Sequence, residues 1–209
     1  MSLFRLVGPL LLLVLGATAA LRPLETDIHP AGNTAVAVYK ATPAGDLKMN
    51  LYFPPGWKVA DRRPAIVFFF GGSCATGSPA QFASTAEYFA KRGLVAASAE
   101  YRIATVHHTP PERCIEDGKS AVRWLRMSAR HLGIDPRRII AGGGSSGGSV
   151  AAFAAYNTSI EPDGEDTSVT CKPDALVLYN PAFGFGDPAR LTPEQRQAAQ
   201  SPLGVLISS

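Results

Sequence analysis

Histidine is scarce in this chain, and none follows residue 131. The 209 residues contain four histidines, two of them adjacent: His29, His107, His108 and His131. The three cysteines show no spacing typical of a zinc site, and the only close histidine pair is the adjacent one. We therefore expect neither a metal site nor any other cofactor.

Cysteine is also too rare, and odd in number, for a disulfide framework. Cys74, Cys114 and Cys171 cannot all pair within the chain. A Cys114–Cys171 bond is one candidate in an oxidising compartment, but the sequence does not establish it.

The chain has no apolar run long enough to span a membrane. The apolar stretch from Leu6 to Gly16 is too short for that. Arg5 precedes it, and Ala17-Thr18-Ala19 places small residues where a signal peptidase cleaves. This pattern predicts a signal peptide over residues 1–19 and a secreted or periplasmic mature protein that begins near Ala20.

Charge is sparse and scattered. Only 18% of the residues are charged and the net charge is +3, so we expect a solvated surface and no nucleic-acid partner. The 46% hydrophobic content suits one domain with a sizeable core.

The strand patterns change along the chain. Residues 34–40 and 47–53 flank a Pro43-Ala44-Gly45-Asp46 turn, and the second segment alternates apolar and polar residues, which predicts an antiparallel hairpin. Unbroken apolar runs, typical of strands buried on both faces, then follow at residues 65–70, 94–99, 138–141 and 175–179.

Helical patterns separate these buried strands. Ser78 with Gln81, and Thr109 with Glu112, predict capping boxes at two helix starts, and Gly93 and Gly133 mark the two ends. Residues 159–174 predict a polar surface loop, and residues 193–200 a weak helix capped by Thr192. Such alternation predicts an α/β fold: a mostly parallel sheet with helices on both faces and an N-terminal antiparallel hairpin.

The segment Gly143-Gly144-Ser145-Ser146-Gly147 fits the motif G-x-S-x-G, in which a serine nucleophile occupies a strained turn between a strand and a helix. Gly143 and Gly147 crowd each other in such a turn, so only glycine fits easily. The apolar segment 138–141 leads in, and the small-residue segment 147–156 leads out.

Other interpretations of this segment remain open. A match shifted by one residue makes Ser146 the nucleophile, although we favour Ser145. Residues 142–147 also fit the dinucleotide motif G-x-G-x-x-G, but the acidic residues about 20 positions on lie in a polar loop rather than after a strand. A glycine-rich turn with no catalytic role is the third alternative interpretation.

Several segments together resemble the α/β-hydrolase fold, and in particular secreted esterases and lipases of the acetyl-esterase and carbohydrate-esterase type. The resemblance runs from about Tyr39 to Leu203. It rests on Phe-Phe-Phe-Gly-Gly-Ser at residues 68–73, Glu-Tyr-Arg at 100–102, Asp-Pro-Arg-Arg-Ile at 135–139 and Gly-Ser-Ser-Gly-Gly at 144–148.

The resemblance implies an oxyanion hole, the set of N–H groups that binds the negative oxygen of the tetrahedral intermediate. Its donors would be the backbone N–H groups of Gly72, Ser73 and Ser146. The chain departs from the family's H-G-G-G pattern, because Phe70 replaces the histidine and Ser73 replaces the last glycine.

The fold orders its catalytic triad as serine, acid, histidine, with the last two beyond the sixth strand. Here no histidine follows Ser145, and none of the later carboxylates is placed as the triad acid, so residues 20–209 look like an incomplete hydrolase domain without its last strands. His107 and His108 fit a pocket wall or plain surface better than a replacement base.

The implied reaction is ester hydrolysis through an acyl-enzyme on Ser145, with a small-molecule or carbohydrate ester as substrate. We expect little activity from this chain alone. A non-catalytic protein that kept the pocket, and a nucleotide-binding domain, are the alternatives.

Overall fold

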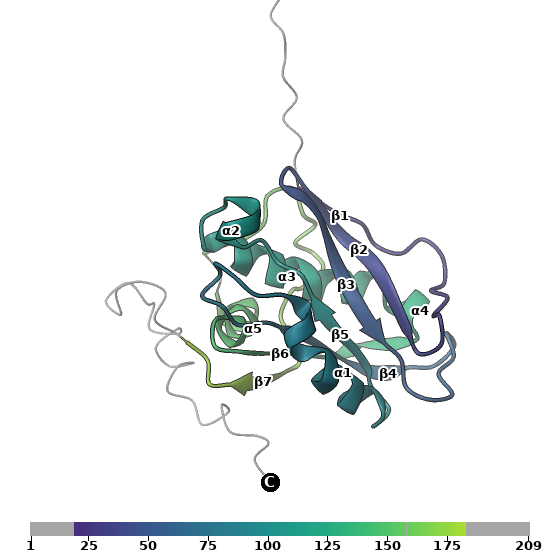
Figure 1. The fold of residues 1–209 in the computed structure, drawn as a ribbon. Coiled ribbons are helices and arrows are strands. Elements are labelled where there is room, and N and C mark those ends of the chain that lie inside the picture. Colours follow the sequence, from purple (N-terminus) through teal and green to yellow (C-terminus); the bar gives the residue numbers. More distant parts are fainter. Residues whose placement is uncertain (1–18, 158, 183–209) are drawn as a thin grey trace, which may run out of the picture.

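The computed structural model describes residues 19–157 and 159–182, which form one sheet with helices on both sides (Figure 1). The sheet has seven strands in the order β1-β2-β3-β5-β4-β6-β7. The strands are β1 (Ala20–Leu21), β2 (Thr34–Thr42), β3 (Gly45–Tyr52), β4 (Arg63–Phe69), β5 (Val95–Ala99), β6 (Ile134–Gly144) and β7 (Ala175–Tyr179).

The strand directions confirm the predicted architecture. β2 and β3 form an antiparallel hairpin, and β3 pairs antiparallel with β5. β5, β4, β6 and β7 are mutually parallel. β7 has the predicted bounds, whereas β6 begins four residues earlier than the apolar run indicated.

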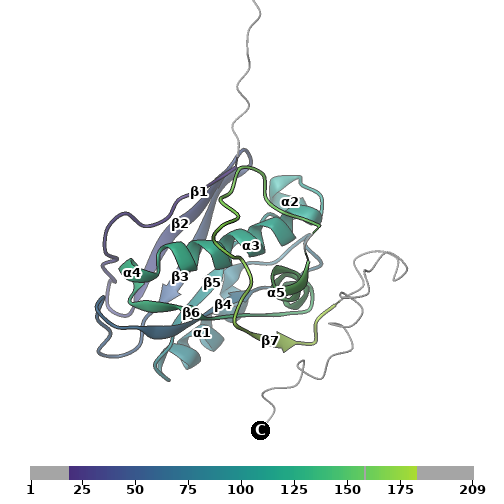
Figure 2. The ribbon, with the colours of Figure 1, turned by 180° about the vertical axis from the view of Figure 1, so that it is seen from behind.

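Helices lie on both faces of the sheet. The 3₁₀ turn η1 (Pro79–Phe82) and α1 (Ala83–Ala90) cover β4 and β5 on one face, while α3 (Glu112–Met127) and α5 (Ser146–Tyr156) cover the other (Figure 2). Two short helices complete the set: α2 (Ala104–His107) and α4 (Ala129–Leu132).

Both predicted capping boxes are wrong. Ser78 precedes a 3₁₀ turn and makes no side-chain cap, and the Gln81 side chain instead accepts a hydrogen bond from the backbone N–H of Gly71. α3 begins after Pro111 without a side-chain cap, and the Thr109 hydroxyl has no partner among the described residues.

The second predicted helix is also broken in two. The buried Ser128 separates α3 from α4, and its hydroxyl accepts a hydrogen bond from the N–H of Leu24, a residue far away in sequence. Gly133 ends α4 with φ 63°, as its role as a stop residue predicted.

The disulfide joins Cys74, in the loop after β4, to Cys114 in α3. The candidate Cys114–Cys171 pair is therefore wrong. Cys171 keeps a free thiol, which is 3.8 Å from the carbonyl oxygen of Ala154.

Some sequence predictions fall outside the described residues. They are the signal peptide up to residue 18, the helix at 193–200, and the segment after residue 182, to which the predicted lack of the last strands refers. Among the helices that the structure does describe, none is both long and apolar enough to cross a membrane.

Candidate active site

Ser145 lies on a sharp turn between β6 and α5. Its backbone has φ 52° and ψ −122°, a conformation that costs a non-glycine residue of order 1–3 kcal/mol. The Ser145 side chain is exposed, whereas Ser146 is 1% exposed within the first turn of α5. This difference favours Ser145 over Ser146 as the reactive residue.

Backbone crowding explains the two glycines that flank this turn. A Cβ on Gly147 would lie 2.1 Å from the carbonyl oxygen of Phe69 and 2.3 Å from that of Phe70. A Cβ on Gly143 would lie 2.5 Å from both the Phe69 oxygen and the Gly147 carbonyl. The crowding expected from the sequence is present, and it extends to the end of β4.

The turn is also held from the side of β7. The N–H of Ser145 donates to the carbonyl oxygen of Tyr179 at 3.0 Å. The carbonyl oxygen of Ser145 accepts from the N–H of Ala182 at 3.1 Å. β7 therefore fixes the orientation of the turn that carries the exposed hydroxyl.

The loop after β4 lies beside this turn. A Cβ on Gly71 would be 3.3 Å from the Ser145 Cβ. Gly72, Ser73 and Cys74 have φ values of 131°, 56° and 54°. At Gly72 only glycine fits, because a Cβ would lie 2.2 Å from the carbonyl oxygen of Thr76.

The predicted oxyanion donors are the N–H groups of Gly72, Ser73 and Ser146. Within the described residues, none of the three donates to a protein acceptor. The Gly71 N–H, in contrast, is occupied by Gln81 Oε1 at 2.6 Å. The three-donor assignment stays a prediction.

Two side chains hold this loop, and no sequence pattern predicted this role for either of them. Gln81 binds Gly71, as described, and the Tyr101 hydroxyl donates to the Phe70 carbonyl oxygen at 2.6 Å. The Tyr101 ring also stacks on Phe70 with centroids 4.1 Å apart. Burial raises the pKa of Tyr101 to about 12, so the phenol stays protonated and keeps donating at neutral pH.

Two of the histidines are engaged elsewhere. His107 Nδ1 accepts a hydrogen bond from the Ile103 N–H at the start of its own helix. His131 Nδ1 contacts Asp27 Oδ1 at 2.8 Å. In the part of the chain that the structure describes, no histidine is hydrogen-bonded to Ser145.

A buried charge cluster lies between β2, α3 and the loop of residues 159–174, and the sequence analysis missed it. Asp117 Oδ1 is 2.9 Å from Lys40 Nζ, and Asp117 also binds Arg102 through two side-chain hydrogen bonds of 2.7 Å. The other members of the cluster are Glu116, Lys119, Ser120, Arg123, Glu161 and Glu165.

This cluster accounts for two acids of the polar loop, Glu161 and Glu165. Glu165 pairs with Arg123 and, at 3.4 Å, with Lys40, while Glu161 pairs with Lys119. A ribose-binding acid would have to follow a strand, and these two instead pair with the cations of the cluster, Glu165 buried and Glu161 at its exposed edge. The dinucleotide interpretation is thereby disfavoured.

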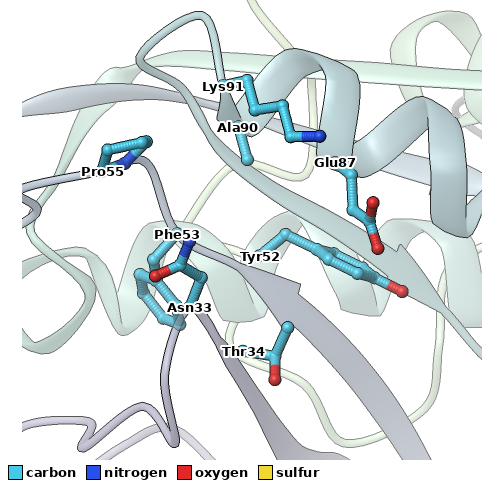
Figure 3. Close-up of a pocket in the computed structure, with 8 residues that line it drawn as sticks. All are labelled: Asn33, Thr34, Tyr52, Phe53, Pro55, Glu87, Ala90 and Lys91. Carbon is cyan, nitrogen blue, oxygen red and sulfur yellow. The ribbon is translucent and has the colours of Figure 1, made fainter.

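A small cavity of about 180 Å³ lies far from the turn. It is lined by Tyr52 and Phe53 at the end of β3, by Glu87 of α1 and by Lys91 just after α1 (Figure 3). Tyr52 pairs with Ala96 near the start of β5, whereas the serine turn follows the opposite ends of β4 and β6. The cavity is therefore not part of this site.

No group of three or more histidine, cysteine or acidic side chains that could hold a metal ion occurs among the described residues. The turn itself presents an exposed serine close to a loop whose Gly72 and Ser73 N–H groups have no acceptor among the described residues.

Known proteins resemble this chain in both sequence and structure. The BD-FAE family model matches residues 49–197. Esterase LipI of Mycobacterium tuberculosis is 32% identical over 114 residues, which cover 54% of this chain and 35% of that protein. Human arylacetamide deacetylase-like 2 is 34% identical over 150 residues, covering 68% of this chain and 35% of that protein.

The structural comparison agrees. Thermogutta terrifontis esterase 2, in a form phosphorylated by paraoxon, matches with a TM-score of 0.72 and 43% identity over 81% of this chain and 65% of that one. The chain thus spans about a third of the length of these two curated relatives. It belongs to the BD-FAE family and has the α/β-hydrolase fold of esterases.

Proposed function

We propose that this chain carries the nucleophile of a serine ester hydrolase. The observation that supports this most directly is the exposed Ser145 hydroxyl on a turn with φ 52° between a strand and a helix. In the proposed reaction Ser145 Oγ attacks the carbonyl carbon of a carboxylic ester, the alcohol leaves, and water then hydrolyses the acyl-enzyme.

The proposed role of the loop after β4 is to stabilise the negative oxygen of the tetrahedral intermediate. The N–H groups of Gly72, Ser73 and Ser146 are unoccupied by described acceptors and lie on the two segments that meet at Ser145. One such donor is worth roughly 10²–10³ in rate.

Ser145 has no described histidine base to activate its hydroxyl. A serine hydroxyl needs a base to remove its proton, and no described histidine is hydrogen-bonded to it. Loss of the triad costs about 10⁶ in turnover. We therefore expect the chain as given to acylate slowly rather than to turn over many substrates.

Acylation by a short aryl acetate tests the proposal. Mass spectrometry of the digested protein is expected to show slow acetylation of the peptide that contains Ser145, and none there in Ser145→Ala. Ser146→Ala is the matched control, because it removes a buried neighbouring hydroxyl and keeps the backbone N–H. Acetylation that is the same in Ser145→Ala as in the unchanged chain would contradict the assignment.

Other outcomes of that assay are equally informative. Rapid turnover abolished by Ser145→Ala would support the hydrolase but overturn the expected low activity. Binding of an acetylated sugar or other ester without acylation would favour a non-catalytic binding protein. An acetylated carbohydrate that acylates Ser145 faster than the aryl ester would identify carbohydrate esters as the preferred class.

Export of the protein is a further part of this proposal. Residues 1–19 have the pattern of a signal peptide, and a buried Cys74–Cys114 disulfide suits an oxidising compartment. Because β1 begins at Ala20, cleavage before this residue leaves the strand whole. N-terminal sequencing of protein from outside the cytoplasm is expected to begin near Ala20, and retention of Met1 on that protein would contradict export by cleavage.

A further inference from the structure

We propose that the Cys74–Cys114 disulfide positions the oxyanion loop, defined as residues 71–77, against the serine turn. Cys114 is thereby a positioning residue for the proposed reaction, although it belongs to α3 and not to the loop. The expected effect on the reaction rate rests on the proposed function. The expected effect on the position of the loop rests on the loop geometry alone.

The backbone of this loop is held in an unfavourable conformation. Gly72 adopts its positive φ freely, but Ser73 and Cys74 are non-glycine residues with φ values of 56° and 54°. Residues in this region persist only when surrounding contacts over-determine them. Two consecutive such residues therefore require strong external contacts, and the disulfide is attached to the second of them.

Other contacts hold the loop on either side of the disulfide. The N–H groups of Ala75 and Thr76 both donate to the Gly72 carbonyl oxygen, at 2.9 and 3.0 Å. The first N–H groups of α2 donate to the loop as well: Ala104 to the Cys74 oxygen at 3.0 Å and Thr105 to the Ala75 oxygen at 3.1 Å. These contacts are individually weak, and α2 itself is a single short, exposed turn.

The disulfide connects this loop to a rigid part of the molecule. Cys74 is 2% exposed and Cys114 is 1% exposed, at the start of a 16-residue helix that packs against β6 and α5. α5 begins with Ser146, the third proposed donor. The covalent bond therefore joins the loop that carries two donors to the helix that supports the turn carrying the other.

The test compares the full chain with Cys74→Ala/Cys114→Ala, using Cys171→Ala as the matched control. Cys171 has a free thiol outside the loop. Hydrogen exchange followed by mass spectrometry is expected to be at least about 10-fold faster in residues 71–77 of the double variant, and unchanged in the control. The protected amides that report this change are those of Gly71, Ala75 and Thr76.

Acylation of Ser145 by the aryl acetate supplies the second readout. Its rate at saturating ester is expected to fall at least about 10-fold, with the half-saturating concentration changed by less than about two-fold, because the donors act on the transition state. A purely structural disulfide would leave the saturating rate of the folded fraction unchanged. If the double variant does not fold, the unchanged chain is reduced after folding, its thiols are blocked, and the same measurements are made.

The outcomes separate this inference from the proposed function. Faster exchange with a lower saturating rate supports the inference. Hydrogen exchange in residues 71–77 that is unchanged in the double variant overturns the inference. Faster exchange together with an unchanged acylation rate at saturating ester also overturns it. Absence of Ser145 acylation in every form contradicts the proposed function, and exchange alone then decides whether the disulfide holds the loop.

Discussion

Replacing Asp117 by alanine is expected to lower the free energy of unfolding by about 3–5 kcal/mol. The carboxylate is fully buried and binds Lys40 and Arg102, which are 0% and 6% exposed. Removal of Asp117 would leave both cations in a low-dielectric interior without their main partner. Urea denaturation of the two proteins measures the loss.

Asp46→Ala is the control for that prediction. Asp46 also forms an ion pair, with Arg22 at 3.4 Å, but both side chains are about half exposed. An exposed pair of this kind contributes about 0–1 kcal/mol. Equal losses in the two variants would show that the buried charge cluster does not stabilise the fold in the way its burial indicates.

The second large effect is expected for Gly147→Ala. The new Cβ would lie within 2.5 Å of backbone atoms of Phe69, the last residue of β4, and of Phe70, which follows it; backbone atoms, unlike a side chain, cannot rotate away. We expect the free energy of unfolding to fall by about 3 kcal/mol or more, which is at or above the upper end of the usual cost of overpacking a core. We also expect Ser145 to be displaced. Thermal unfolding and the rate of Ser145 acylation measure both consequences.

Gly144→Ala provides a control within the same turn. A Cβ there would have its nearest neighbours at 3.3 Å, the Phe82 ring, and at 3.7 Å, the Tyr179 oxygen, so the side chain can be accommodated by small adjustments. We expect a change below about 1 kcal/mol. A Gly144→Ala variant as unstable as Gly147→Ala would contradict the claim that backbone crowding selects glycine at position 147.

The sequence was informative where the cause of a structure is local. An apolar run bounded by turn residues predicted β7 within its bounds, and clean alternation predicted the hairpin of β2 and β3. The glycine spacing predicted the turn at Ser145, because the crowding between residues 143 and 147 arises within five residues. Each of these features depends on neighbours along the chain.

The predictions failed where a distant partner changes the outcome. Gln81 has the spacing of a capping residue, but its side-chain oxygen Oε1 instead accepts a hydrogen bond from the N–H of Gly71. Ser128 interrupts a continuous helical pattern because it binds Leu24. The buried charge cluster joins residues as far apart as Lys40, Asp117 and Glu165, and no local pattern distinguishes these side chains from solvated ones.

In the candidate site, too, the features with local causes could be predicted and those that depend on distant residues could not. The nucleophile and its glycines could be read from one segment, whereas the supports of the oxyanion loop could not. Gln81, Tyr101 and Cys114 reach the loop from three different elements. For the cysteines the sequence left several pairings open, and the one candidate it suggested was not the pair that forms.

The strand order has a consequence for how the chain acquires its structure during synthesis. β5 lies between β3 and β4, which are consecutive in sequence but never pair in the native sheet. While the stretch from Phe69 to Val95 is translated, on the order of 1–5 s at about 5–20 residues per second, β5 is not yet present to separate β3 from β4. Premature pairing of β3 with β4 would be a kinetic trap in that interval. Pro54 and Pro55 lack a backbone N–H, so they hinder such pairing from extending past the end of β3.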